Sequence, residues 1–214
     1  MQQLFLPEIS NVPPLTNGDH LSRAEFERRY HAMPALKKAE LIEGVVYMPS
    51  PLRLRQHAKP HGLIMAWLVG YAGSVPNVEW GDAPTVRLDQ DNEPQPDAIL
   101  RLIENGSSRI SADDYIEGAP ELVVEIAASS VSMDMHSKLN VYRRNGVQEY
   151  LVWKVTEQAV SWFSLQSGTD TTLLPDEEGI LKSLVFPGLW LNVPALIEAQ
   201  VTEVLATLQM GILS

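Results

Sequence analysis

Short blocks of apolar residues alternate with polar, turn-forming segments along most of the chain. The alternating, β-branched block at residues 40–48 predicts a pair of strands or one strand with a bend at Gly44. Apolar positions at helical spacing predict a helix over residues 61–71. The most apolar short run, ELVVEIA at residues 121–127, is typical of a central strand. The pattern therefore predicts a sheet with at least one helix packed on it.

The beginning of the chain has a different character. Residues 1–20 are rich in proline, asparagine and glycine, which predicts an extended N-terminal arm without a core of its own. Ser22 and Glu25 then have the spacing of a capping box, so a helix is predicted over residues 23–31. No internal repeat or low-complexity tract interrupts the remainder, and we expect residues 21–214 to form a single domain.

Helix-capping and turn residues place the remaining elements. Ser132 or Asp134 can cap a helix that ends at Asn145, where Gly146 supplies the left-handed residue. The other predicted elements are strands at 78–80, 85–88 and 97–102, a hairpin of 150–155 and 159–165, short strands near Leu173 and Leu181, and a helix after Pro194. This order predicts an α/β or α+β domain, a mixed sheet flanked by helices without a regular βαβ repeat.

Composition narrows the function classes. The 214-residue chain has no cysteine, which excludes disulfides, thiolate zinc sites and cysteine nucleophiles, so any metal must bind to oxygen or imidazole. Its net charge of −11 disfavours a protein that coats nucleic acid nonspecifically. A local basic face stays possible, with Arg53, Arg55, Lys59, Arg143 and Arg144 as candidates. The chain contains neither a membrane-spanning apolar stretch nor a signal-peptide pattern, and we expect a cytoplasmic protein.

Two carboxylates are predicted to meet at one edge of the sheet. Asp97 begins one predicted strand, and Glu125 lies near the end of the next strong one. If the two strands pair antiparallel, the start of one lies beside the end of the other. Neighbouring carboxylates repel unless a proton or cation intervenes, and oxygen ligands suit Mg²⁺ or Mn²⁺. The pattern therefore predicts a divalent-metal site.

The helix that follows carries a lysine at the border of its apolar stripe. Lys138 stands one turn from Met135 and from Tyr142, so its amine can reach inward along the end of the sheet. A lysine there can hold a phosphate oxygen or orient an attacking water.

Each of these residues also has a purely structural interpretation. Asp97 can be a turn former, Glu40 can face solvent from an antiparallel strand, and Lys138 can be a surface lysine whose stem covers apolar neighbours. Glu125 resists such an interpretation because it stands inside an apolar strand.

A pair of histidines at helical spacing is a further candidate. His57 and His61 are four residues apart, as metal ligands on one helical face can be, but Pro60 disfavours a helix through both. We therefore expect a loop or a first helical turn there. The sequence contains no dinucleotide-binding fingerprint, P-loop or nucleophile-elbow motif.

Three segments in matching order carry a resemblance to a known family. ELIEGVVYMPSP, QPDAILR and PELVVEIAASS…HSKLNVYRRNGVQEYLVWKV together resemble the Uma-type restriction-endonuclease-like family, a branch of the PD-(D/E)XK nuclease superfamily, and the likeness extends more loosely through FPGLWL. The resemblance implies a restriction-endonuclease-like fold and a Mg²⁺-dependent endonuclease that acts on DNA.

The resemblance also implies roles for individual residues. Asp97 and Glu125 match the two acidic metal ligands, with the carbonyl of Ile126 as a further metal contact. Glu40 matches an early glutamate that assists through the metal or water. His61 matches a histidine before the apolar helix, a place for which His57 competes.

Two positions depart from the family pattern. Ala127 stands where the superfamily has a lysine, and Ala128 where the family commonly has serine; Lys138, in a KLxxY context, takes the place of the missing lysine. The leading hypothesis is a metal-dependent DNA endonuclease. The alternatives are a catalytically weak or inactive nuclease fold that acts as a binding or regulatory homodimer, and an acid/base hydrolase that uses the carboxylate pair without metal.

Overall fold

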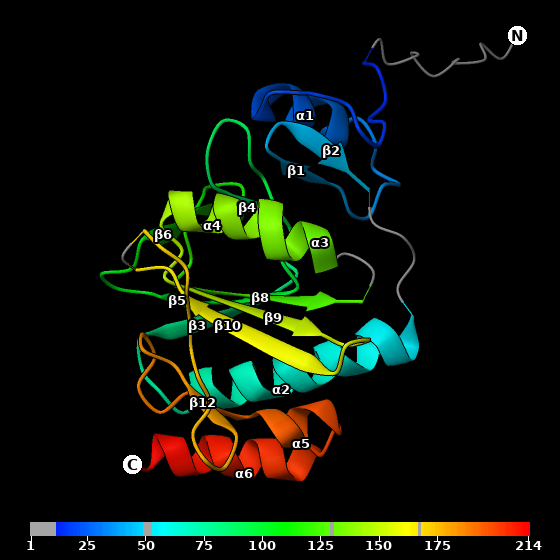
Figure 1. Ribbon diagram of the computed structural model, residues 1–214. Helices are drawn as coiled ribbons and strands as arrows, with labels where there is room; N and C mark the ends of the chain where they lie inside the picture. Colours follow the sequence, from blue (N-terminus) through cyan, green and yellow to red (C-terminus); the bar gives the residue numbers. More distant parts are fainter. Residues whose placement is uncertain (1–11, 49–52, 129–130, 167) are drawn as a thin grey trace, which may run out of the picture.

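A mixed sheet of six strands forms the centre of the computed structural model, which describes residues 12–48, 53–128, 131–166 and 168–214 (Figure 1). Its strands, in spatial order, are β11 (Thr171–Thr172), β10 (Ala159–Ser164), β9 (Glu149–Lys154), β8 (Leu122–Ala127), β5 (Ala98–Leu102) and β3 (Val78–Asp82). Strands β8 and β9 are parallel, and every other neighbouring pair is antiparallel. The most apolar run of the sequence is therefore a central strand, as predicted.

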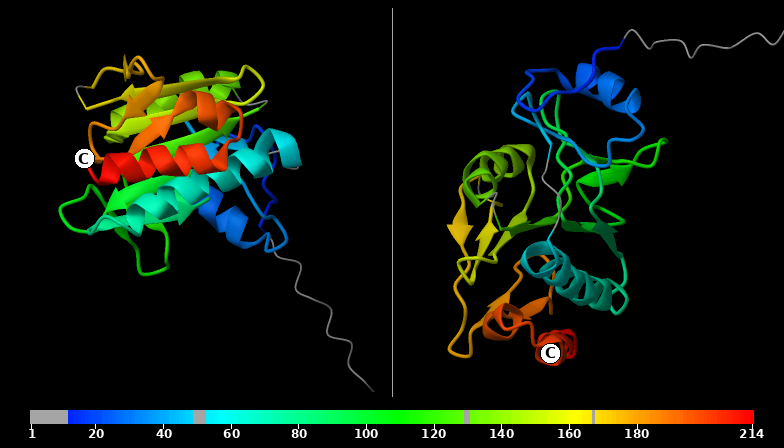
Figure 2. Two further views of the ribbon diagram at one scale, coloured as in Figure 1. Left: turned by 90° about the horizontal axis from the view of Figure 1, so that it is seen from below. Right: turned by 90° about the vertical axis from the view of Figure 1, so that its right-hand side faces the viewer.

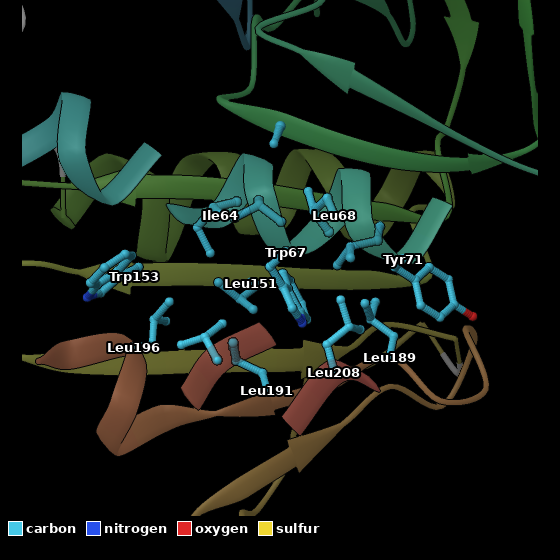
Figure 3. Packing of buried hydrophobic residues seen from close by; sticks show 14 of the residues in the cluster. Ile64, Trp67, Leu68, Tyr71, Leu151, Trp153, Leu189, Leu191, Leu196 and Leu208 are labelled. Atoms are coloured by element: carbon cyan, nitrogen blue, oxygen red, sulfur yellow. The ribbon is translucent and has the colours of Figure 1, made fainter. Parts of the chain in front are cut away.

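Helix α2 (Lys59–Ala72) covers one face of this sheet. Beyond it lie helices α5 (Val193–Ile197) and α6 (Val201–Ile212) with the small sheet of β12 (Ile180–Lys182) and β13 (Trp190–Asn192). Trp67 is fully buried at the centre of this layer, and its indole N–H donates to the Trp190 carbonyl at 2.9 Å (Figure 3). The largest hydrophobic core of the protein lies here because the apolar stripe of α2 faces the sheet.

A second helical segment covers the opposite face. It consists of α3 (Val131–Met133), one turn of π-helix, η2 (Asp134–Lys138), and α4 (Leu139–Asn145), and it ends at Gly146 with φ of 90°. Figure 2 shows α4 and α2 on opposite sides of the sheet. The two faces thus bury separate cores, and β8 contributes to both.

The N-terminal elements form a smaller layer next to α4, on the side of the sheet away from α2 (Figure 1). Helix α1 (Arg23–His31) packs on the hairpin of β1 (Glu40–Ile42) and β2 (Val45–Tyr47) around a third, small core. Leu41 pairs with Glu93 in an isolated β-bridge, which connects this layer to the loop before β5. A three-stranded sheet combines β4 (Val86–Arg87), which precedes β5 in the chain, with β7 (Ile116–Gly118) and β6 (Ser108–Ile110), which lie between β5 and β8.

These elements confirm the predicted mixed sheet flanked by helices, the strand pair at residues 40–48 and the hairpin after residue 150. Of the predicted arm, residues 1–11 lie outside the described residues, and Leu15 is buried in the small core with Phe26. In the described residues, no helix has the length and apolar character needed to cross a bilayer.

Several local predictions were wrong. Helix α1 begins after Ser22, but no capping box forms, because the Ser22 side chain makes no cap hydrogen bond and Glu25 accepts from Arg28 and Arg29 instead. The helix expected to be capped by Ser132 or Asp134 already includes both residues. Strands β6, β7 and β13 were not predicted; each has only three residues, too few for a visible alternation.

Candidate active site

Asp97 and Glu125 lie side by side on one face of the sheet. Strands β5 and β8 are antiparallel with Ala98 opposite Val124, so the same register puts Asp97 opposite Glu125. Ile99 and Val123, two residues further along each strand, belong to the core beneath α4. Because side chains alternate between faces, both carboxylates point toward the α3–η2–α4 side.

Lys138 reaches this pair from the helical layer. Its ammonium nitrogen lies 2.9 Å from Oε1 of Glu125 and 2.9 Å from Oε1 of Glu40. Lys138 is 2% exposed and Glu40 is 4% exposed, so neither is the solvent-facing residue that the structural interpretations allowed. Residues from β1, β8 and η2 thus meet in one buried cluster, and Lys138 connects them.

The helical layer supplies two further polar groups. Asp134, one turn before Lys138, is buried with its Oδ1 3.7 Å from the lysine nitrogen. The Tyr142 hydroxyl, one turn after Lys138, donates to Oε1 of Glu125 at 3.0 Å. From the sequence, Asp134 was predicted only as a possible cap and Tyr142 only as a residue of the apolar stripe. Their spacing of four residues on either side of Lys138 was the available signal.

Helix α2 and the turn before it hold Asp97 from the other side. Its Oδ2 accepts the Ile126 N–H at 2.7 Å, and its Oδ1 lies 3.1 Å from Nε2 of His57. Nε2 of His61 lies 3.0 Å from the carbonyl oxygen of Asp97. Both histidines therefore contact the same aspartate.

This arrangement corrects the expectation that Pro60 disfavours a helix through both histidines, whereas the first helical turn, one of the two predicted alternatives, is present. One turn of π-helix, η1 (Leu54–Ala58), runs into α2, and Pro60 stands in the first turn of α2, where a missing N–H is tolerated. The rings of His57 and His61 stack with their centroids 5.8 Å apart. Lys38 completes this side, with its Nζ 3.8 Å from Oδ1 of Asp97.

Burial and charge separate the two carboxylates. Burial raises the pKa of Glu125 to about 8, although the Lys138 charge acts in the opposite direction. Burial also disfavours the charged form of Lys138, but the surrounding carboxylates Glu125, Glu40 and Asp134 outweigh it and raise its pKa well above the usual value. For Asp97, burial is outweighed by the His57 hydrogen bond and the Lys38 charge, which leave its pKa below the usual value. The cluster around Lys138 thus holds more carboxylates than cations, and it favours an additional proton or cation.

The carboxylate and carbonyl oxygens of this site are suitable ligands for a small hard cation. Lys138 and Tyr142 both donate to Oε1 of Glu125, so neither occupies Oε2. The Ile126 N–H points toward Asp97, and since N–H and C=O of one strand residue point the same way, its carbonyl also lies on the β5 side of β8. Within the described ranges, no three His, Asp or Glu side chains form a metal-binding group. Two carboxylates, one carbonyl and water are a set that Mg²⁺ accepts.

Comparison with known proteins identifies the family. The family model of Uma2, described as "Putative restriction endonuclease", matches residues 23–194. This chain belongs to the Uma2 family. A crystal structure of a "putative nuclease" from Anabaena variabilis superposes with a TM-score of 0.63 at 16% sequence identity, covering 80% of this chain and 96% of that one. Among curated proteins, none matches. The fold of this Uma2 member is thus nuclease-like.

Proposed function

We propose that this Uma2 member is a Mg²⁺- or Mn²⁺-dependent endonuclease that hydrolyses phosphodiester bonds of DNA. The observation that carries the proposal is the buried contact of the Lys138 ammonium with Glu125, on the face of the sheet where Asp97 also lies. A phosphodiesterase needs a binding site for a cation and a positive group near the phosphate, where negative charge develops. Asp97 and Glu125 would supply the first, and Lys138 would supply the second.

Asp97, Glu125 and the Ile126 carbonyl would hold the cation. When bound, the cation would act as a Lewis acid on the phosphate. Asp97 is suited to this role because its pKa lies below the usual range, so it is ionised at neutral pH. The Ile126 N–H fixes the orientation of Asp97 through Oδ2. The backbone of β8 would therefore orient one ligand and supply another.

Lys138 would stabilise the negative charge that grows on the phosphate and orient the attacking water. Glu40 is a positioning residue in this scheme, because its Oε1 accepts from Lys138 and also from the backbone N–H of Gln95 at 2.8 Å. Glu40 and Glu125 thus hold the Lys138 ammonium from two sides, and little reorganisation is needed when charge develops on the phosphate.

The proposal is tested by cleavage of plasmid and branched DNA with Mg²⁺ or Mn²⁺. Asp97→Asn and Lys138→Gln should lower the rate by at least about 100-fold, the effect of losing one preorganised electrostatic group. Lys182→Gln is the matched control, because Lys182 is half exposed and pairs with Asp176 away from the site. Equal residual cutting by the wild type and both site variants would mean that the activity comes from a contaminant.

Binding without turnover is the second candidate function. It is favoured by Ala127, which is buried in the core beneath α4 at the position where the superfamily has a lysine. Isothermal titration with Mn²⁺ separates the candidates: a nuclease should bind the ion and lose it in Glu125→Ala, whereas a regulatory module should give no heat with either protein.

In both cases we propose a homodimer in the cytoplasm, and light scattering on the purified protein tests the dimer.

A further inference from the structure

Most Lys and Arg side chains of this acidic chain are paired with a carboxylate. Among the described residues, each Lys and Arg forms a salt bridge with an Asp or Glu, with the exception of Lys37, Arg53, Arg55 and Lys59. In a protein with a net charge of −11, such pairs contribute no net positive potential. A polyanion would find unpaired positive charge at these exceptions.

Three of the exceptions stand together. Arg53, Arg55 and Lys59, which we call the basic turn, fall within seven residues that contain no acid, and all three are exposed. The segment is η1 with the residues on either side of it, and it projects at the end of α2 (Figure 1). The sequence alone did not distinguish these residues from the other candidates for a basic face.

The structure makes that distinction. Arg143, which the sequence also nominated, is paired with Asp170 at 2.6 Å, and Arg144 is paired with Glu43 at 3.0 Å. Both lie on the last turn of α4. Their charges are neutralised by partners far away in the sequence, which no local pattern predicts.

The basic turn also lies next to the candidate active site. His57, in the middle of it, contacts Asp97 at 3.1 Å through its side chain. Arg53 is the extended residue before η1, Arg55 lies within η1, and Lys59 is the first residue of α2. The three cations of the basic turn are therefore close enough along the chain to contact neighbouring phosphates of one DNA strand.

We propose that the basic turn binds the phosphate backbone of duplex DNA beside the bond to be cleaved. The inference rests on the proposed function for its choice of DNA as the polyanion. Arg55 and Lys59 are four residues apart and neighbours on the helical segment, and His57 between them contacts Asp97. The DNA backbone can therefore be held next to Asp97 while the side chains of the basic turn stay outside the buried cluster around Lys138.

The test is DNA binding by fluorescence anisotropy, with a labelled duplex in EDTA so that neither metal nor cleavage is involved. The variant is Arg55→Gln with Lys59→Gln, and the control is Arg143→Gln with Arg144→Gln, which removes the same charge from paired positions. We expect the basic-turn variant to weaken binding at least about 10-fold and to lower the slope of log K against log salt by about 2, the value for two lost phosphate contacts. The control should stay within about twofold of the wild type.

Equal weakening by both double variants, or by neither, would overturn the inference, as would a wild type that does not bind the duplex. Failure of the proposed function looks different. A wild type that binds through the basic turn but cuts no DNA with Mg²⁺ or Mn²⁺ would keep the surface and remove the nuclease. Cleavage that depends on Asp97, together with unchanged binding by the basic-turn variant, would keep the nuclease and remove the surface.

Discussion

Removal of the Lys138 ammonium is the most direct perturbation of the buried cluster. In Lys138→Met the stem of the side chain keeps its volume, but Glu40, Glu125 and Asp134 lose the positive charge at 2.9, 2.9 and 3.7 Å. A buried ion pair that loses one partner costs about 3–5 kcal/mol, because the remaining charge stays desolvated. We expect a loss of this size in the free energy of unfolding, which is a large part of the total stability of a domain.

The assay is urea unfolding followed by circular dichroism, with Lys182→Met as the control. Lys182 pairs with Asp176 at 3.0 Å, but its side chain is 45% exposed, so its loss should cost less than about 1 kcal/mol. The double variant Lys138→Met with Glu125→Gln should recover part of the loss, because a neutral amide replaces the unpaired carboxylate. Similar losses below about 1 kcal/mol for both lysines would refute the reasoning, since the cluster would then not depend on its cation.

Three further predictions concern parts of the fold outside the site. Burial, followed by the hydrogen bond with Glu27, raises the pKa of Glu93 to about 8, so its contribution to stability is complete below pH 4.5 and lost as the pH rises toward 8. Across that window the wild type should lose up to about 1.4 kcal/mol of its free energy of unfolding per pH unit, and Glu93→Gln should abolish this loss. Urea midpoints that fall equally with pH in the wild type and the variant would contradict this. Gly211→Ala should lower stability by about 1–3 kcal/mol, because its Cβ would meet the Gly188 carbonyl oxygen and the Trp190 ring. Gly62→Ala, in α2 with open space around it, should raise stability by about 0.5–1 kcal/mol, and thermal melts of the two glycine variants compare them.

The sequence predicts those features of the fold that depend on local pattern. Strand β8 is recognisable because its residues are apolar on both faces, as a strand covered by helices requires. The meeting of Asp97 and Glu125 follows from one additional assumption, antiparallel pairing, which the structure confirms. Burial of Glu125 inside an apolar strand then marks it as a residue that needs a partner.

Other parts of the fold depend on contacts between distant residues. The region before β8 shows this, since both oxygens of Glu121 accept backbone N–H groups, one from Leu102 and one from Ser107, where the chain turns toward β6. The residues between β5 and β8 are mostly polar. Nothing in the composition identifies the carboxylate that organises its backbone.

The site itself depends on the packing of layers more than on any motif. A lysine two residues after Glu125 would stand on the same strand, where its position follows from the strand alone. Here Ala127 occupies that position, and the ammonium comes from η2, 13 residues after Glu125, across the boundary between helix and sheet. Its location is therefore determined by how the α3–η2–α4 segment packs on β8 and by Glu40, 98 residues away in the sequence. A search by motif spacing misses such a lysine, whereas the apolar stripe of its helix predicts it, because the stripe determines which side of the helix faces the sheet.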